Sequence, residues 1–159
     1  MNQPSCLEPT SPPDDVEVVM RAARVISGVV AESVAQTGDA VTMPQLRTLV
    51  LVASRPEVNA SAIAASLGVH LSNASRLCDR LVRAGLLHRR QSETDRRNLV
   101  LTLTPAGASL VGSIMEHRRL AFARLLARLS PPCRAGLVTA LDELSNVAGE
   151  PAEIDLRLP

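Results

Sequence analysis

Residues 70–105 decide the fold of this chain, and they read HLSNASRLCDRLVRAGLLHRRQSETDRRNLVLTLTP. The first half of this stretch repeats apolar residues with the helical period, so a helix over 71–85 has two distinct faces. Leucine, alanine and cysteine side chains fall on one face, and arginine, serine and asparagine side chains fall on the other. One face is suited to packing on a core. The other carries the groups that nucleic-acid-binding helices use.

The second half of the stretch predicts two strands and a charged loop. A short strand over 86–90 begins with two leucines, and a polar loop follows over 91–97. Residues 98–103 then alternate polar and apolar, as a strand with one buried face does. Two strands directly after a two-faced helix indicate a wing.

Two shorter helices precede this stretch. The pair Thr42 and Gln45 has capping-box spacing at the start of a helix over 43–54. A second helix over 60–67 ends at Gly68, which supplies a left-handed residue. The short helix, the tight turn and the two-faced helix together have helix-turn-helix spacing.

Longer helices flank this unit. A helix over 16–36, which Asp14 or Asp15 can cap, carries a broad apolar stripe and is expected to bury most of its girth. Helices over 105–129 and 131–148 follow the wing. The first of these is about 37 Å long at 1.5 Å per residue, longer than a compact winged domain. A second copy of the chain is the economical cover for its apolar side. The alternative is a monomeric bundle in which the flanking helices cover one another.

The predicted fold class is mainly α with a small β-hairpin wing (α+β), a winged helix-turn-helix domain with long terminal dimerisation helices. The expected organisation runs through five segments in chain order: a disordered tail 1–13, an N-terminal dimerisation helix 14–37, the winged domain 38–104, C-terminal dimerisation helices 105–148 and a tail 149–159.

Charge is concentrated rather than abundant. The 17 basic and 16 acidic side chains give a net charge of +1, so global charge alone does not indicate a nucleic-acid partner. Between Arg76 and Arg97, however, seven arginines accompany three acids, which is a local electrostatic footprint for nucleic acid. The chain has three cysteines at irregular spacing and no apolar run long enough for a membrane span. We therefore expect a reducing, cytoplasmic setting and no membrane.

Four motifs in order carry a family resemblance over roughly residues 16–148. They are Thr42-x-x-Gln45-x-x-x-Leu49, Ala62-Ile63-Ala64-x-x-Leu67-Gly68-Val69, Ser75-Arg76-x-x-Asp79-Arg80-Leu81-x-x-x-Gly85-Leu86, and Asp95-Arg96-Arg97 followed by Leu101-Thr102-Leu103-Thr104-Pro105-x-Gly107. With these motifs the chain resembles the MarR family of winged helix-turn-helix transcriptional regulators. The resemblance implies a homodimer with interlocked terminal helices, in which each subunit presents one winged domain to a near-palindromic DNA operator.

The expected DNA-binding residues lie on the polar helix face and in the wing. Side chains near the start of the helix are candidates for base or phosphate contacts, and the arginines further along are candidates for phosphate contacts. The helix set is Ser72, Asn73, Ser75, Arg76, Arg80 and Arg83. The resemblance implies that Arg96 or Arg97 enters the minor groove. It also implies that Asp95 braces the wing through a salt bridge, with Arg76 as the plausible partner.

Regulation is open at this point. The resemblance implies a small organic effector between the dimerisation helices and the winged domain. Arg21, Arg24, Arg47 or His117 could meet an anionic one. Aromatic walls are common in such pockets, but Phe122 is the single aromatic residue of the chain. A constitutive repressor without any ligand is the alternative.

Other classes find less support. A thiol-based redox sensor is one alternative, but Cys78 lies on the apolar helix face and is expected to be a small core residue. The histidines lie on three different predicted elements, so we expect no metal, and His70 is expected to be a helix cap. No catalytic constellation or cofactor motif is present, so the chain is not expected to be an enzyme. The competing binding function is a winged helix that contacts protein rather than DNA.

Overall fold

The computed structural model describes residues 12–36, 41–55, 57–92 and 99–149. Its elements are two terminal helices, three helices and a hairpin of the winged domain, and one long connecting helix. In chain order they are α1 (Pro12–Ala35), α2 (Met43–Ser54), α3 (Ala60–Leu67), α4 (Leu71–Arg83), β1 (Leu87–Gln91), β2 (Leu99–Leu103), α5 (Pro105–Leu126) and α6 (Pro131–Val147). The predicted fold class, mainly α with a hairpin wing, is confirmed.

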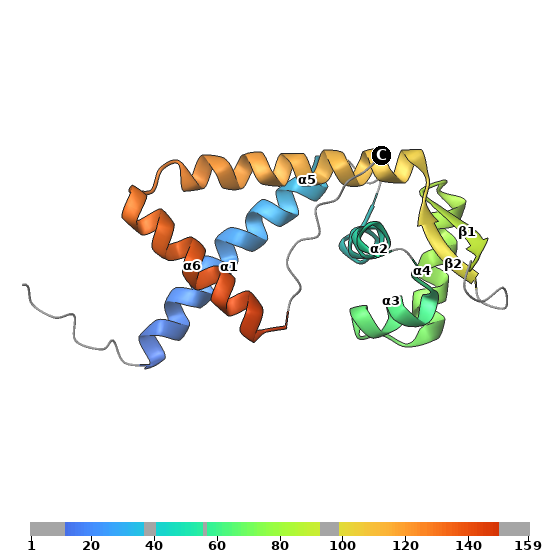
Figure 1. Ribbon diagram of the computed structural model, residues 1–159, viewed down its shortest axis with the longest axis horizontal. Coiled ribbons are helices and arrows are strands. Elements are labelled where there is room, and N and C mark those ends of the chain that lie inside the picture. Colours follow the sequence, from blue (N-terminus) through green and yellow to red (C-terminus); the bar gives the residue numbers. More distant parts are fainter. Residues whose placement is uncertain (1–11, 37–40, 56, 93–98, 150–159) are drawn as a thin grey trace, which may run out of the picture.

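The molecule has two parts joined by one helix. Figure 1 shows α2, α3, α4 and the hairpin gathered at one end of α5, with α1 and α6 at the other. Two predicted bounds were wrong. Helix α1 begins at Pro12, so Asp14 and Asp15 lie in its first turn rather than at its cap. Helix α5 ends at Leu126 instead of continuing to residue 129.

The core lies in the winged part and at the first half of α5. Large side chains from every layer of that part are fully buried: Leu46, Leu49, Ile63, Leu81, Leu87 and Ile114. The apolar face of α4 is buried as predicted at Ala74, Leu77 and Cys78. The prediction was wrong for Leu71, whose side chain is 47% exposed because the first turn of α4 extends beyond the core.

The wing is an antiparallel pair that extends from Leu87 opposite Leu103 to Gln91 opposite Leu99. A third segment joins it. The amide of Leu101 donates a hydrogen bond of 2.7 Å to the carbonyl of Val58, which forms an isolated bridge. Sequence reasoning missed this bridge because a single paired residue leaves no alternating pattern.

A Schellman turn directs the chain from α4 into β1. Gly85 has φ 71°, a conformation that favours glycine. The amide of Gly85 donates to the carbonyl of Val82, and the amide of Leu86 donates to that of Leu81, both at 3.0 Å. The turn therefore fixes the point at which the wing leaves α4.

The start of α5 is locked onto this turn. The Thr104 hydroxyl donates to the carbonyl of Gly85 at 2.6 Å and accepts from the amide of Gly107 at 3.0 Å. The Thr104 amide donates to the carbonyl of Leu86 at 3.1 Å. A Cβ at Gly107 would lie 2.1 Å from the Leu86 carbonyl oxygen. The Thr-Pro-x-Gly motif thus exists because α5 begins in direct contact with the backbone of the turn.

The terminal helices are exposed in the single chain. Helix α6 buries no residue, and the large apolar side chains in the first part of α1, from Val16 to Ile26, are more than a third exposed. The expectation that α1 buries most of its girth was therefore wrong for one chain. In the single chain, the flanking helices do not cover one another's apolar side chains as the alternative bundle requires. The contact between α1 and α5 includes the guanidinium of Arg118, which donates to the buried hydroxyl of Ser33 at 3.3 Å.

Candidate nucleic-acid interface

The first turn of α4 is capped by a side chain. The amide of Ser72 donates to Nδ1 of His70 at 3.3 Å, and the Ser72 hydroxyl lies 3.0 Å from the same nitrogen. The prediction that His70 is a helix cap is confirmed. The cap satisfies one free amide of the first helical turn. It also holds the Ser72 hydroxyl at the N-terminal end of α4, and helices that enter the major groove contact bases with that end.

The polar face of α4 forms a shallow basic hollow. Four predicted residues line it together: Asn73, Arg76, Arg80 and Arg83. All four are exposed, as is Ser72, whereas Ser75 is half-buried at the edge of the face. Three guanidiniums and an amide on one exposed surface supply donors for phosphate oxygens and for base edges. The structure therefore brings four of the six predicted helix residues together in one hollow.

An ion pair links this helix to the wing. Nη2 of Arg89 on β1 lies 2.5 Å from Oδ1 of Asp79 on α4. The sequence motifs include Asp79, but the sequence did not single out Arg89 as its partner. The signal was available in the sequence: an acid one helical turn from the end of α4 and a basic residue early in the next strand can reach each other across the turn.

The base of the wing is anchored on its other side. The Ser92 hydroxyl donates to Oε1 of Glu57 at 2.9 Å, and Ser92 is buried. The loop residues Asp95, Arg96 and Arg97 lie outside the described residues. Minor-groove insertion and the Asp95–Arg76 brace consequently remain predictions.

Cys78 is part of the core. Its side chain is fully buried on α4. Burial raises the pKa of the Cys78 thiol, although the nearby Arg89 guanidinium acts in the opposite direction. A buried thiol held in its neutral form is a poor nucleophile. The interpretation of Cys78 as a small core residue is therefore confirmed.

Comparison with known proteins identifies the family. The model of the MarR family matches residues 41–99. The chain is 34% identical over 105 residues to an uncharacterized HTH-type transcriptional regulator of Bacillus subtilis, YfiV, and the match covers 66% of each protein. The crystal structure of RV1404 from Mycobacterium tuberculosis is 36% identical, with a TM-score of 0.83, over 92% of this chain and 100% of that one. This chain belongs to the MarR family.

It is a MarR-type transcriptional regulator with a winged-helix fold. Regulators of this family are not enzymes, which confirms the prediction on that point. A more distant structure, of Streptococcus pneumoniae FabT in complex with DNA, shares the fold at 20% identity and a TM-score of 0.72. The match covers 84% of this chain and 96% of that one.

The four predicted effector residues of this MarR-family chain do not form one site. Arg21 and Arg24 are exposed on α1, and Arg47 is exposed on α2. His117 lines a groove of about 520 Å³ between α1 and α5 that contains none of the other three. Nδ1 of His117 lies 3.2 Å from the carbonyl of Ser113, to which it can donate within its own helix.

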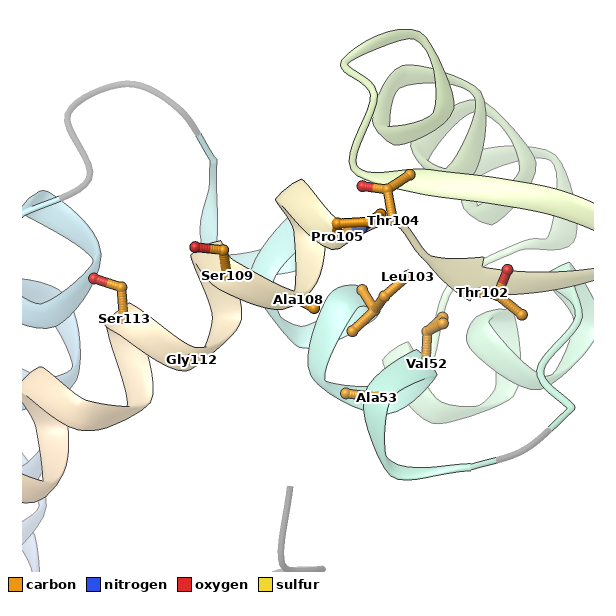
Figure 2. A pocket seen from close by; sticks show the side chains of 10 residues that line it. All are labelled: Val52, Ala53, Thr102, Leu103, Thr104, Pro105, Ala108, Ser109, Gly112 and Ser113. Atoms are coloured by element: carbon orange, nitrogen blue, oxygen red, sulfur yellow. The ribbon is translucent and has the colours of Figure 1, made fainter. Parts of the chain in front are cut away.

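A larger groove, of about 770 Å³, lies where the winged part meets α5. Figure 2 shows its lining: aliphatic side chains of α2 with Thr102 and Leu103 of β2 on one side, and small or hydroxyl side chains of α5 on the other. The residues are Val52, Ala53, Thr102, Leu103, Thr104, Pro105, Ala108, Ser109, Gly112 and Ser113. The lining holds no charged side chain, so an anion would find no counterion there.

The described residues offer neither a metal site nor a membrane span. Within the described ranges, His, Cys, Asp and Glu residues form no cluster that could hold a metal ion. Among the helices that the structure describes, none combines the length and the apolar character required to cross a membrane.

Proposed function

We propose that this chain is a homodimeric, sequence-specific DNA-binding regulator, most simply a repressor, that acts in the cytoplasm on a near-palindromic operator. Helix α4 would lie in the major groove and the 91–97 wing in the adjacent minor groove. The observation that carries the proposal is the exposed face of α4, where Arg76, Arg80 and Arg83 share one hollow with Asn73. The distant relative of the same fold that was solved with DNA supports this assignment.

The exposed terminal helices support the homodimer. Apolar side chains remain uncovered along both: Val16, Val18, Val19, Met20, Val25 and Ile26 on α1, and Leu137, Val138, Leu141, Leu144 and Val147 on α6. Monomeric soluble proteins rarely leave so many large apolar side chains exposed. A second copy would cover them and would hold two α4 helices at a fixed separation.

Selection from a random pool of duplex DNA tests the proposal, because it requires no operator sequence to be chosen beforehand. The wild-type protein is expected to enrich one inverted repeat with half-sites centred about 10 base pairs apart, one turn of the duplex. The double variant Arg76→Ala/Arg80→Ala should enrich nothing although it folds. If the wild-type protein enriches no sequence, or if both proteins enrich the same one, α4 does not read DNA.

The groove beside α5 is the site we propose for an effector. Because its lining is aliphatic and hydroxylic, a neutral, largely apolar molecule fits it better than the anion considered from the sequence. An effector that favours a dimer with mismatched helix spacing would typically weaken DNA binding by ~1–3 kcal/mol. Ser109→Leu should weaken the response by narrowing the groove and should leave DNA binding intact. An unchanged response in that variant would place the effector elsewhere.

A further inference from the structure

Asp79 is an acid on the surface proposed to face DNA. It lies on α4 between Arg76 and Arg83, where a carboxylate would repel phosphate oxygens. Its Oδ1 is 2.5 Å from Nη2 of Arg89, and the two side chains are 39% and 42% exposed, respectively. The pair therefore neutralises a charge that would otherwise oppose binding, and it also occupies one of the arginines of the wing.

The position of this pair suggests more than charge compensation. The Schellman turn at Gly85 joins α4 to β1 at one point. The Asp79–Arg89 contact joins the same two elements at a second point, ten residues apart along the chain. The turn and the buried side chain of Leu87 hold the start of β1, and the ion pair holds the strand to α4 two residues further along.

The strand that Arg89 belongs to is itself part of a fixed unit. Arg89 lies opposite Leu101 in the hairpin, and the amide of Leu101 donates to the carbonyl of Val58. The Glu57–Ser92 hydrogen bond ties the same base to the α2–α3 connection. Because β1 is paired and anchored in this way, a displacement of Arg89 would displace the base of the wing with it.

We propose that Asp79 and Arg89 are positioning residues that set the angle between α4 and the wing, and thereby the discrimination between operator and other DNA. This inference rests on the proposed DNA-binding function. A rigid angle allows the major-groove and minor-groove contacts to form together only on a duplex of matching shape. Without the ion pair, the helix and the wing bind DNA with less mutual constraint.

A purely structural role would give a different result. An exposed ion pair contributes little to folding stability, because water screens the charges and both side chains lose conformational freedom. We therefore expect Asp79→Asn and Arg89→Gln to leave the thermal midpoint of the protein nearly unchanged. The effect should appear in DNA discrimination instead.

The test uses the opposite charge of the two residues. Affinity is measured for the selected operator and for a scrambled duplex at the same salt concentration, and the ratio is compared among variants. Asp79→Asn removes a negative charge, so binding to the scrambled duplex should rise or stay equal. Arg89→Gln removes a positive charge, so that binding should fall. Both variants break the same contact, and both should lower the operator-to-scrambled ratio by about tenfold, the middle of the range for coupled neighbours.

Four further variants complete the experiment. The double variant Asp79→Asn/Arg89→Gln should lose no more discrimination than either single variant, because the contact is already broken. Arg89→Lys, which keeps the charge, should retain part of the ratio. Glu116→Gln and Arg119→Gln, exposed residues of α5 with the same charge changes, are the matched controls and should leave the ratio unchanged.

The outcomes separate this inference from the proposed function. If the operator-to-scrambled ratio rose in one single variant and fell in the other, the ratio would follow charge. That result would overturn the positioning role but leave the proposed DNA binding in place. Additive losses in the double variant would also overturn it. If the wild-type protein bound operator and scrambled duplex equally, the proposed function itself would fail.

Discussion

The winged part and the terminal helices of this chain solve the problem of apolar surface in opposite ways. The winged part closes on itself: Leu49, Ile63 and Leu81 are fully buried, and its turns and helix starts are capped by side chains or backbone. Helix α6 buries nothing, although it repeats leucines at helical spacing. This difference shows that amphipathic patterning predicts which helix face must be buried. It does not predict whether the same chain or another chain buries that face.

Placing an aspartate at a leucine position in each part tests this comparison most strongly, and the larger effect is expected in the winged part. Leu81→Asp places a carboxylate in a fully buried position of α4, which should cost at least ~4–5 kcal/mol and unfold the winged part. Loss of the cooperative thermal transition in circular dichroism would show this. A variant that unfolds at the wild-type temperature would mean that the core is not where Leu81 lies.

The next largest effect is expected where α5 meets the winged part. Gly107→Ala would place a Cβ 2.1 Å from the Leu86 carbonyl oxygen, so α5 must shift away from the turn. We expect a loss of ~1–3 kcal/mol in unfolding free energy from denaturant titration. Gly136→Ala in α6, where a Cβ would meet nothing within 4 Å, is the control and should be neutral or slightly stabilising.

The counterpart of Leu81→Asp in the terminal helices should behave differently. Leu141 is 40% exposed in the single chain, so Leu141→Asp should change the stability of the winged part by no more than about 0.5 kcal/mol. If a second copy covers α6, the variant should dissociate in sedimentation velocity at concentrations where the wild type is a dimer. A variant that remains a dimer would place the dimer interface elsewhere.

The smallest expected effect concerns Cys78. With Cys6 and Cys133 replaced by serine, the remaining thiol should react with a disulfide reagent only after unfolding, because it is buried and its pKa is raised. The pKa of the Cys78 thiol in the folded protein lies above the ordinary value of 9.0. Proton binding by this thiol therefore stabilises the fold below pH 9.0, and this stabilisation is lost as the pH rises through the folded pKa. Rapid reaction of the folded protein at neutral pH would reopen the redox alternative.

Much of the winged part could be predicted because its signals are local. The caps at Asn59 and His70, the left-handed Gly68 and the two faces of α4 are each decided within a few residues. The Val58 bridge and the Asp79–Arg89 pair could not be predicted in this way, since they depend on which segments meet after folding. The prediction that α1 is buried was wrong, because its stripe of valines was expected to pack on a core and the single chain provides no core beside most of them.

The candidate site shows the same division. Helix periodicity alone placed Asn73, Arg76 and Arg80 on one face, and the structure gathers them in one hollow. The four effector candidates were chosen by residue type without a position in space, and the structure separates them.

The salt dependence of operator binding tests the central claim most directly. If the basic face of α4 contacts the DNA backbone, log Kd should rise with log salt at a slope of about 0.9 for each phosphate neutralised, and Arg80→Ala should reduce that slope by about 0.9 if Arg80 neutralises one phosphate. Arg119→Ala, on an exposed position of α5, should leave the slope unchanged. A flat salt dependence of the wild-type protein, or an equal slope in all three proteins, would contradict the account.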